Sequence, residues 1–214
     1  MNYNIISSGS KGNAVIINDI ILIDCGVSFK KLRPYADKLK LVMLTHRHSD
    51  HFKKATIKRL ASERPTLRFA APEWLYEGLI KCGVEDSKID IVEAGKIYAY
   101  GAFSISPIKL YHDCPNTGYR LFWGEEKALY ATDTYTLDGI SAKNYDLYLI
   151  ECNYEDEEIK ERIRVKEEQG EFAYEKRVLK THLSKAQADD FLVQNCGDRS
   201  EFVYMHEHEG MKDE

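Results

Sequence analysis

Short apolar runs separated by glycine or charged segments recur along the chain. Runs of four to eight apolar residues are typical of buried strands, whereas longer stretches with helical periodicity indicate helices. The pattern predicts helices at 55–64, 72–82, 156–168 and 185–195, with Ser184 and Gln187 forming a capping box before the last one. Strands are predicted at residues 4–7, 14–18, 20–24, 41–45, 67–71, 89–93, 96–100, 103–110, 119–123, 128–132, 147–151 and 202–205.

Strands outnumber helices early in each half, which favours two sheets with helices outside them over a regular alternation of strand and helix. We therefore expect an α+β protein with a four-layer αββα sandwich. With 214 residues and 43% hydrophobic content, the chain is long enough for one compact domain and short for two, so a single domain over 1–214 is expected.

The N-terminal sequence lacks the pattern of a signal peptide, and no apolar run approaches the length of a membrane span. These features predict a soluble cytoplasmic protein with no membrane partner. The five cysteines are widely spaced and never form a Cys-x-x-Cys pair, which indicates neither a disulfide framework nor a thiolate zinc knuckle.

Three histidines and an aspartate follow directly after the predicted strand 41–45. They are His46, His48, Asp50 and His51. In extended backbone His46 and His48 project the same way and can bind one metal ion, and a turn at Ser49 brings the other two toward a second ion. Such a loop needs further ligands from elsewhere in the chain.

Three more candidate ligands stand at the ends of later predicted strands. His112, Asp133 and His206 each follow an apolar run, and His208 competes with His206 for the role of last ligand. An aspartate also closes the strand 20–24, at Asp24.

The set His46-x-His48-x-Asp50-His51, followed by His112, Asp133 and His206, resembles the motif pattern of metallo-β-lactamase-fold hydrolases over nearly the whole chain. The resemblance implies two divalent metal ions, zinc by preference, with manganese or iron tolerated by the same donors. It implies His46, His48 and His112 on the first ion, Asp50, His51 and His206 on the second, and Asp133 bridging them. Asp24 would orient a ligand without binding metal itself.

Glu151 at a strand end and His182 before a helix are similar to the acid pair of the phosphodiesterase branch, which includes ribonuclease Z and exonuclease-like proteins. In that branch a metal-activated water attacks phosphorus. Asp50 would orient this water, and His182, held by Glu151, would protonate the leaving alkoxide. The segment 7–13, Ser-Ser-Gly-Ser-Lys-Gly-Asn, also resembles the opening of the exonuclease-like proteins, either as a simple turn or as a phosphate contact.

The formal net charge of −5 argues against a broad basic face that grips long nucleic acid. The cations Arg47, Lys53, Lys54, Lys58 and Arg59 are either phosphate contacts or ordinary surface residues. Nucleic-acid ends and small nucleotides, including cyclic ones, are therefore the expected substrates, and a homodimer is an expectation from similar phosphodiesterases.

Three other classes stay open on the same residues. A thioester or lactam hydrolase uses the same metals on a carbonyl and needs no proton donor such as His182. A di-iron redox protein usually carries an acidic residue in place of His48 and needs a flavin domain. A non-catalytic metal-binding protein has no use for a complete dinuclear ligand set.

Overall fold

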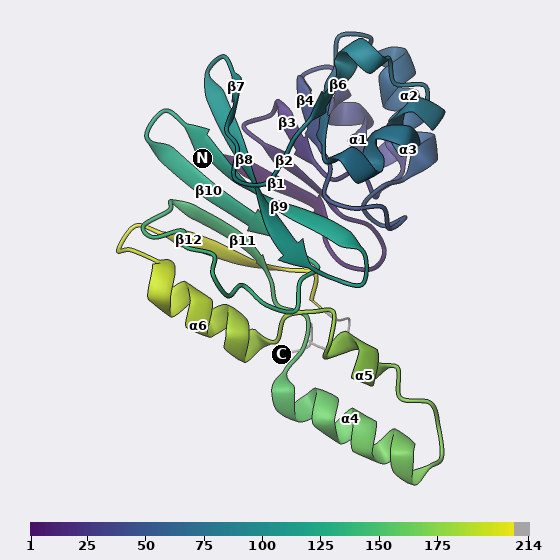
Figure 1. Ribbon diagram of the computed structural model, residues 1–214, viewed down its shortest axis with the longest axis vertical. Coiled ribbons are helices and arrows are strands. Elements are labelled where there is room, and N and C mark those ends of the chain that lie inside the picture. The colour runs from purple at the N-terminus through teal and green to yellow at the C-terminus, as the bar shows by residue number, and fades with distance from the viewer. Residues whose placement is uncertain (208–214) are drawn as a thin grey trace. The chain divides into compact units, whose positions relative to one another are not determined.

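The computed structural model describes residues 1–207, which divide into two compact units (Figure 1). Unit 1 runs from Met1 to Pro107 and unit 2 begins at Ile108. None of the helices in this described part combines the length and apolar character needed to cross a bilayer.

Unit 1 is built on a six-stranded sheet whose strands follow one another in chain order. Its first three strands pair antiparallel, and β3 to β6 pair parallel. The strands are β1 (Tyr3–Ser7), β2 (Ala14–Ile17), β3 (Ile21–Ile23), β4 (Leu41–Met43), β5 (Arg68–Ala71) and β6 (Ile89–Ile91). Because β3 and β4 are parallel neighbours, the residues that follow them meet at one edge of the sheet, and the amide of Asp24 donates to the carbonyl of Met43 at 2.8 Å.

The helices of unit 1 connect its parallel strands. They are α1 (Phe29–Ala36), α2 (Lys54–Glu63) and α3 (Tyr76–Lys81), with the short 3-10 turns η1 (Glu73–Leu75) and η2 (Asp86–Lys88). The core is formed by apolar residues of the strands and of the inner helix faces, including Leu22, Val42, Ile57 and Leu60. The unit ends with β7 (Tyr98–Tyr100), which pairs antiparallel with the start of β8 (Phe103–Tyr111).

Unit 2 contains β9 to β12 of the second six-stranded sheet, whose strand order is β12-β11-β10-β9-β8-β7; β10, β11 and β12 are parallel and β9 pairs antiparallel with β10. The strands are β9 (Pro115–Trp123), β10 (Glu126–Ala131), β11 (Leu147–Glu151) and β12 (Glu201–Met205), and the helices are α4 (Asp156–Glu168), α5 (Glu175–Val178) and α6 (Lys185–Asn195). Residues at the ends of the three parallel strands again come together at one edge. Glu151 is the last residue of β11, and Asp133 and His206 follow β10 and β12.

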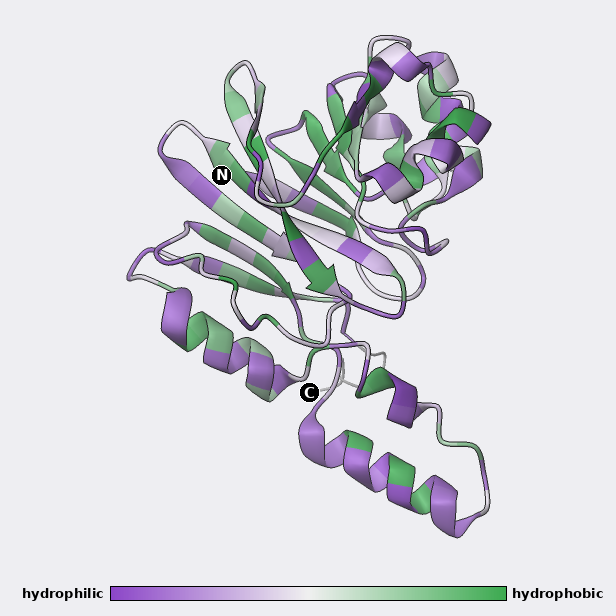
Figure 2. Ribbon diagram, viewed as in Figure 1, coloured by the Kyte–Doolittle hydropathy of each residue, from purple (hydrophilic) through white to green (hydrophobic). Residues whose placement is uncertain are grey.

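The sequence pattern located most of these elements. The bounds of β11, α4 and α6 agree with the predicted ranges, and the capping box is present, with the Ser184 hydroxyl accepting from the Gln187 amide at 3.3 Å. As its composition suggests, α4 is hydrophilic over most of its length and carries a few apolar bands (Figure 2). The pattern missed α1, which contains Pro34 and buries only Leu32 and Ala36, and it missed the single turn of α5.

The cysteines form no disulfide, as expected, and four of the five are buried. Burial raises the pKa of the Cys25 thiol far above its ordinary value. These residues therefore serve as small apolar core side chains.

Candidate metal-ligand clusters

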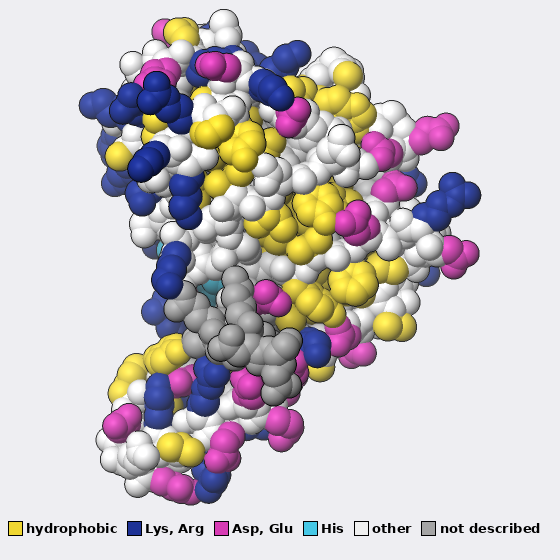
Figure 3. All heavy atoms as spheres, turned by 180° about the vertical axis from the view of Figure 1, so that it is seen from behind, with side chains coloured by type: hydrophobic (Ala, Val, Ile, Leu, Met, Phe, Trp, Pro, Cys, Tyr) yellow, Lys and Arg dark blue, Asp and Glu magenta, His cyan; other side chains and the backbone are white. Residues whose placement is uncertain are grey.

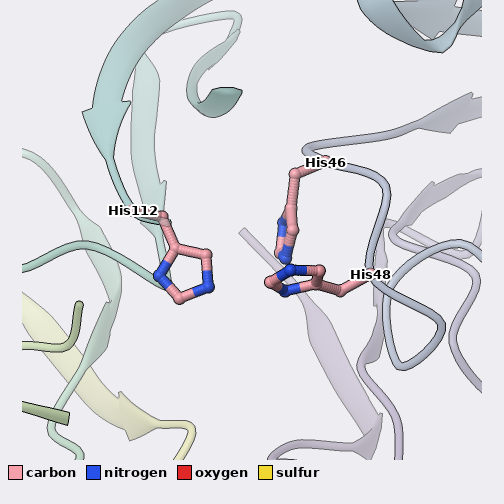
Figure 4. Close-up of side chains that lie close together, drawn as sticks. All are labelled: His46, His48 and His112. Carbon is pink, nitrogen blue, oxygen red and sulfur yellow. The ribbon is translucent and has the colours of Figure 1, made fainter. Parts of the chain in front are cut away.

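In unit 1 the four candidate ligands of the predicted metal loop lie together after β4. His46 and His51 are fully buried, whereas His48 and Asp50 are partly exposed. The ring of His46 lies 4.7 Å from that of His48 and 4.2 Å from that of His51, measured between centroids. Nε2 of His51 lies 3.6 Å from a carboxylate oxygen of Asp50. Figure 4 shows His46 and His48 extending from this loop, and His112 at the end of β8.

Asp24, Thr45 and the histidines form a hydrogen-bond network that determines which ring nitrogens carry protons. The buried Asp24 carboxylate lies 2.7 Å from Nδ1 of His51 and accepts from the Thr45 amide and hydroxyl. Nδ1 of His51 therefore carries the ring proton and donates a hydrogen bond to Asp24. The Thr45 hydroxyl uses its only hydrogen to donate to Asp24, so it accepts a hydrogen bond from Nδ1 of His46 at 3.0 Å. Both rings consequently present an unprotonated Nε2, the form that binds a metal ion.

Asn13 is a site residue that the sequence interpretation did not single out within the segment 7–13. Its side chain is fully buried and its Oδ1 accepts from the Gly9 amide at 2.8 Å, which identifies Nδ2 as the atom facing Nε2 of His51 at 2.7 Å. Asn13 thus donates to the same lone pair that a metal ion would take. Its backbone amide also donates to the carbonyl of Asp50 at 2.6 Å, so Asn13 ties the opening segment to the metal loop.

Asn13→Ala is expected to lower the free energy of unfolding of the metal-free protein by about 2 kcal/mol, because it leaves the buried Gly9 amide without its acceptor. Urea unfolding in the presence of a chelator measures this change. The matched control is Asn4→Ala, since Asn4 is exposed and its amide bonds only the Tyr35 hydroxyl. Equal losses in the two variants would show that Asn13 does not brace the loop.

The metal loop is also packed closely against Gly26. A Cβ atom at this position would lie 1.6 Å from the carbonyl oxygen of Asp50 and 2.8 Å from the amide nitrogen of Asn13. Such distances are far inside van der Waals contact, so only glycine allows the three segments to meet.

In unit 2 the structure brings four candidate residues into one cluster. Asp133, Glu151, His182 and His206 offer ligand atoms that all lie within 4.8 Å of one another. Three of the four are buried, and His182 is partly exposed. An Oδ1 of Asp133 lies 3.5 Å from Nε2 of His206 and 3.9 Å from Nε2 of His112.

Glu151 holds His182 through a short hydrogen bond. Oε1 of the fully buried Glu151 lies 2.6 Å from Nδ1 of His182, and its other oxygen accepts from the backbone amides of Thr134 and Leu183. Burial disfavours the imidazolium form, but the Glu151 and Asp133 carboxylates together outweigh it, so the pKa of His182 is raised above its ordinary value. The pair is therefore a histidine held in one orientation with its protonated form stabilised.

His112 has the opposite electrostatic character. Burial lowers its pKa, and the Asp133 carboxylate opposes this only in part. Nδ1 of His112 donates to the carbonyl of Thr181 at 2.8 Å, which leaves an unprotonated Nε2. A neutral ring in this tautomer is suited to metal binding.

His206 is contacted by Asn153, a residue that the sequence interpretation did not single out. The Asn153 amide donates to the His206 carbonyl at 2.9 Å and lies 3.1 Å from Nδ1. With Asn153 donating to Nδ1, the proton of the neutral ring lies on Nε2, so metal binding at Nε2 would require the other neutral tautomer, with the proton on Nδ1. The competing candidate His208 lies outside the described residues.

Three candidate site residues adopt left-handed backbone. The φ angles of Asp24, Asp133 and His206 are 59°, 58° and 56°. Positive φ is uncommon for residues other than glycine and concentrates at functional sites, where the surroundings hold the strained conformation. At all three strand ends the chain turns sharply and directs a side chain into a cluster.

The donors in the two clusters suit divalent metal ions. Each cluster combines imidazoles with carboxylates, and His46, His51 and His112 present an unprotonated Nε2. Nitrogen and carboxylate donors of this kind bind zinc, and also manganese and iron. The residues present therefore fit the metal ions that the resemblance implies.

Comparison with known proteins identifies the family. Residues 20–193 match the model of the β-lactamase superfamily domain, a span that contains Asp24, Glu151, His182 and all the proposed metal ligands except His206. No curated protein sequence matches the chain.

Several solved structures share the fold. The metallo-β-lactamase fold protein YhfI from Bacillus subtilis has a TM-score of 0.73 and 20% identity, with 97% of this chain and 86% of that chain covered. The short form of human tRNase Z has a TM-score of 0.71 and 14% identity, with coverages of 100% and 95%. A diphosphatase of the PhnP family has a TM-score of 0.66 and 13% identity, with coverages of 96% and 86%.

These matches confirm the predicted fold class, two sheets with helices. Identities at this level show the fold alone. The chain belongs to the β-lactamase superfamily and has the metallo-β-lactamase fold.

Proposed function

We propose that this protein is a dinuclear metal-dependent phosphodiesterase that cleaves nucleic-acid ends or small nucleotides, including cyclic ones. The observation that carries the proposal is the Glu151–His182 pair beside Asp133 in unit 2. A protonated histidine in this position is useful for a reaction whose leaving group is an alkoxide, because an alkoxide departs readily only when it is protonated.

The proposed ligands are those of the motif pattern. His46, His48 and His112 would hold one divalent cation, Asp50, His51 and His206 the other, and Asp133 both. Zinc is the proposed metal, since imidazoles outnumber carboxylates in this set. When bound, two such cations lower the pKa of a water molecule toward neutrality and balance the negative charge on the phosphoryl oxygens.

Protein side chains orient the attacking water and protonate the leaving group. Asp50 accepts a hydrogen bond from the attacking water and fixes its direction. His182 donates the proton on Nε2 to the departing oxygen, while Glu151 keeps the ring oriented through Nδ1 and stabilises its charge. The two backbone amides on Glu151 keep that carboxylate in place throughout.

The names of two structural relatives support phosphate-ester chemistry. Human tRNase Z and the PhnP-family diphosphatase share the fold of this chain, although their low identities leave the substrate a proposal. A hydrolase acting on a thioester or lactam would use the same metal ligands but has no alkoxide for His182 to protonate.

A substrate panel tests the proposal. Purified protein loaded with zinc or manganese is incubated with bis(p-nitrophenyl) phosphate, single-stranded DNA, RNA, cyclic mono- and dinucleotides, a thioester and a β-lactam. We expect hydrolysis of phosphodiesters and none of the carbonyl substrates. Hydrolysis of the thioester or lactam alone would assign the protein to the carbonyl class, and hydrolysis of nothing would remove the enzymatic proposal.

Removal of the metal is expected to abolish phosphodiester hydrolysis, because the uncatalysed attack of water on a phosphodiester anion is extremely slow. Activity on bis(p-nitrophenyl) phosphate is measured after dialysis against a chelator and again after addition of zinc, manganese or magnesium. Recovery with zinc or manganese is predicted. Full activity of protein shown to be metal-free would contradict a metal-dependent mechanism.

A further inference from the structure

Seven exposed cations lie on or beside the first two helices of unit 1. We call this surface the basic face. The segment 29–64 contains 11 lysine and arginine residues but only three aspartate and glutamate residues. The basic face consists of Lys30, Lys31 and Arg33 on α1, Lys53 just before α2, and Lys54, Lys58 and Arg59 on α2.

The packing of the two helices directs these cations outward. Helix α1 buries Leu32 and Ala36, and α2 buries Thr56, Ile57 and Leu60. The helices contact each other, and the Arg59 guanidinium lies over the Phe29 ring, 4.8 Å from its centroid. Lysine and arginine side chains gather over the helices of unit 1 in the upper left of Figure 3.

Little acidic charge neutralises this face. Within residues 1–207, Arg59 is the only member that forms an ion pair, with Glu63 in its own helix at 2.6 Å. The other six side chains form no ion pair with a carboxylate in this part of the chain, so their charges are available to a ligand. Lys58 also lines a cavity of about 340 Å³, together with Arg64, Lys88 and Glu85.

The whole-chain charge conceals how unevenly the charges are divided. Residues 1–107 contain 16 basic and 11 acidic residues, a net charge of +5, whereas residues 108–214 contain 14 basic and 24 acidic residues, a net charge of −10. The basic character is therefore concentrated on one part of one unit. The total of −5 describes neither unit.

The chemistry of the face favours a nucleic-acid strand over a membrane or a protein surface. The large hydrophobic side chains that are exposed in unit 1, Trp74, Ile80 and Ile97, all lie outside α1 and α2. A helix that lies on a membrane needs an apolar face to insert, and protein interfaces depend on buried aromatic anchors. A face made only of cations is suited to phosphates of a polymer, which bind largely by releasing counterions.

We propose that the basic face binds the phosphate backbone of a single nucleic-acid strand, so that the substrate is a strand end and not a free cyclic nucleotide. The inference that the bound strand is cleaved rests on the proposed phosphodiesterase function, whereas binding of the strand does not require hydrolysis. Lys53 follows His51 by two positions, so the face begins next to the metal loop within the same unit. A strand held there has its phosphates beside that loop.

Two quadruple variants test the proposal. The first carries Lys30→Ala, Lys31→Ala, Lys54→Ala and Lys58→Ala. The control carries Lys96→Ala, Lys143→Ala, Lys160→Ala and Lys176→Ala, which removes the same charge from exposed positions elsewhere. Fluorescence anisotropy measures binding of labelled, phosphorothioate 20-residue DNA and RNA strands and of poly-glutamate, at several salt concentrations, and hydrolysis of bis(p-nitrophenyl) phosphate is followed in parallel.

For the first variant we expect affinity for the strands to fall at least about 10-fold, with a salt dependence of log K shallower by about 3, and the control to stay close to the unaltered protein. Hydrolysis of the small diester should be unchanged in both variants. The docking proposal is overturned if the unaltered protein does not bind the strands, if the two variants bind alike, or if poly-glutamate binds as tightly as the strands. Failure of diester hydrolysis with strand binding intact would instead remove the proposed function and leave the docking face.

Discussion

His182→Ala is expected to lower kcat for phosphodiester hydrolysis by about 10²- to 10⁴-fold while both metal ions stay bound. The ring of His182 is held by Glu151 at 2.6 Å, and the raised pKa keeps a proton available for the leaving oxygen. All seven proposed metal ligands are unchanged in this variant. Steady-state kinetics on a single-stranded DNA oligonucleotide, whose leaving group is an alkoxide, and metal analysis by mass spectrometry, made on the same preparation, measure the two quantities.

Glu151→Gln should act in the same direction, since an amide cannot stabilise the charged ring. Glu175→Gln is the matched control, because Glu175 is also buried in unit 2 but pairs with Lys166. Loss of metal from the His182 variant would show that His182 is a ligand, as its place in the cluster of four allows. Unchanged kcat would exclude it as the proton donor.

The second large effect is expected for Gly26→Ala. The new methyl group would lie 1.6 Å from the Asp50 carbonyl oxygen, so the metal loop must move as a whole. We expect a loss of about 3 kcal/mol in the free energy of unfolding, and metal affinity weakened by at least about 10-fold, because overpacking shifts the backbone that carries Asp50 and His51. Urea unfolding of the metal-free protein and competition with a chromogenic chelator measure these changes.

Gly83→Ala provides the control for introducing a methyl group. Gly83 has a φ of 81° and no atom within 4 Å of the position of a Cβ, so its replacement costs only the backbone strain, about 1 kcal/mol, and leaves metal affinity unchanged. A Gly26 variant that resembles the Gly83 variant in both measurements would contradict the close packing of the loop against this glycine.

The strands that position the clusters were predictable because each is a short buried run bounded by polar residues. Residues 41–43 and 147–151 are buried throughout, and their apolar character is visible without knowledge of the fold. The candidate ligands follow such runs directly, so their places at strand ends were predictable as well. Helix α1 was not, because its few buried residues and Pro34 give it no helical signature in the sequence.

The residues that support the ligands were harder to find. Asn13 lies 38 positions before His51 and reaches it only because the turn from Gly9 to Asn13 folds back onto the metal loop. In the sequence Thr45 is simply the last residue of a predicted apolar strand, yet its hydroxyl determines that the ring proton of His46 lies on Nδ1. Hydrogen bonds between segments distant in sequence leave no local pattern.

The distribution of charge was also not predictable from the whole-chain total. A sum over the whole chain combines a basic unit with a strongly acidic one, and the resulting −5 argued against a basic face. The position of the compact units along the chain, and the exposure of the lysines on α1 and α2, are properties of the folded protein. Only with them can the local charge be assigned to a surface.

The central claim, that this chain binds two divalent cations through the proposed ligands, is tested most directly by anomalous X-ray scattering from crystals of the zinc-loaded protein. Data collected on both sides of the zinc absorption edge should show two peaks, one bound by His46, His48 and His112 and one by Asp50, His51 and His206, with Asp133 at both. A map without peaks at these residues would contradict the account.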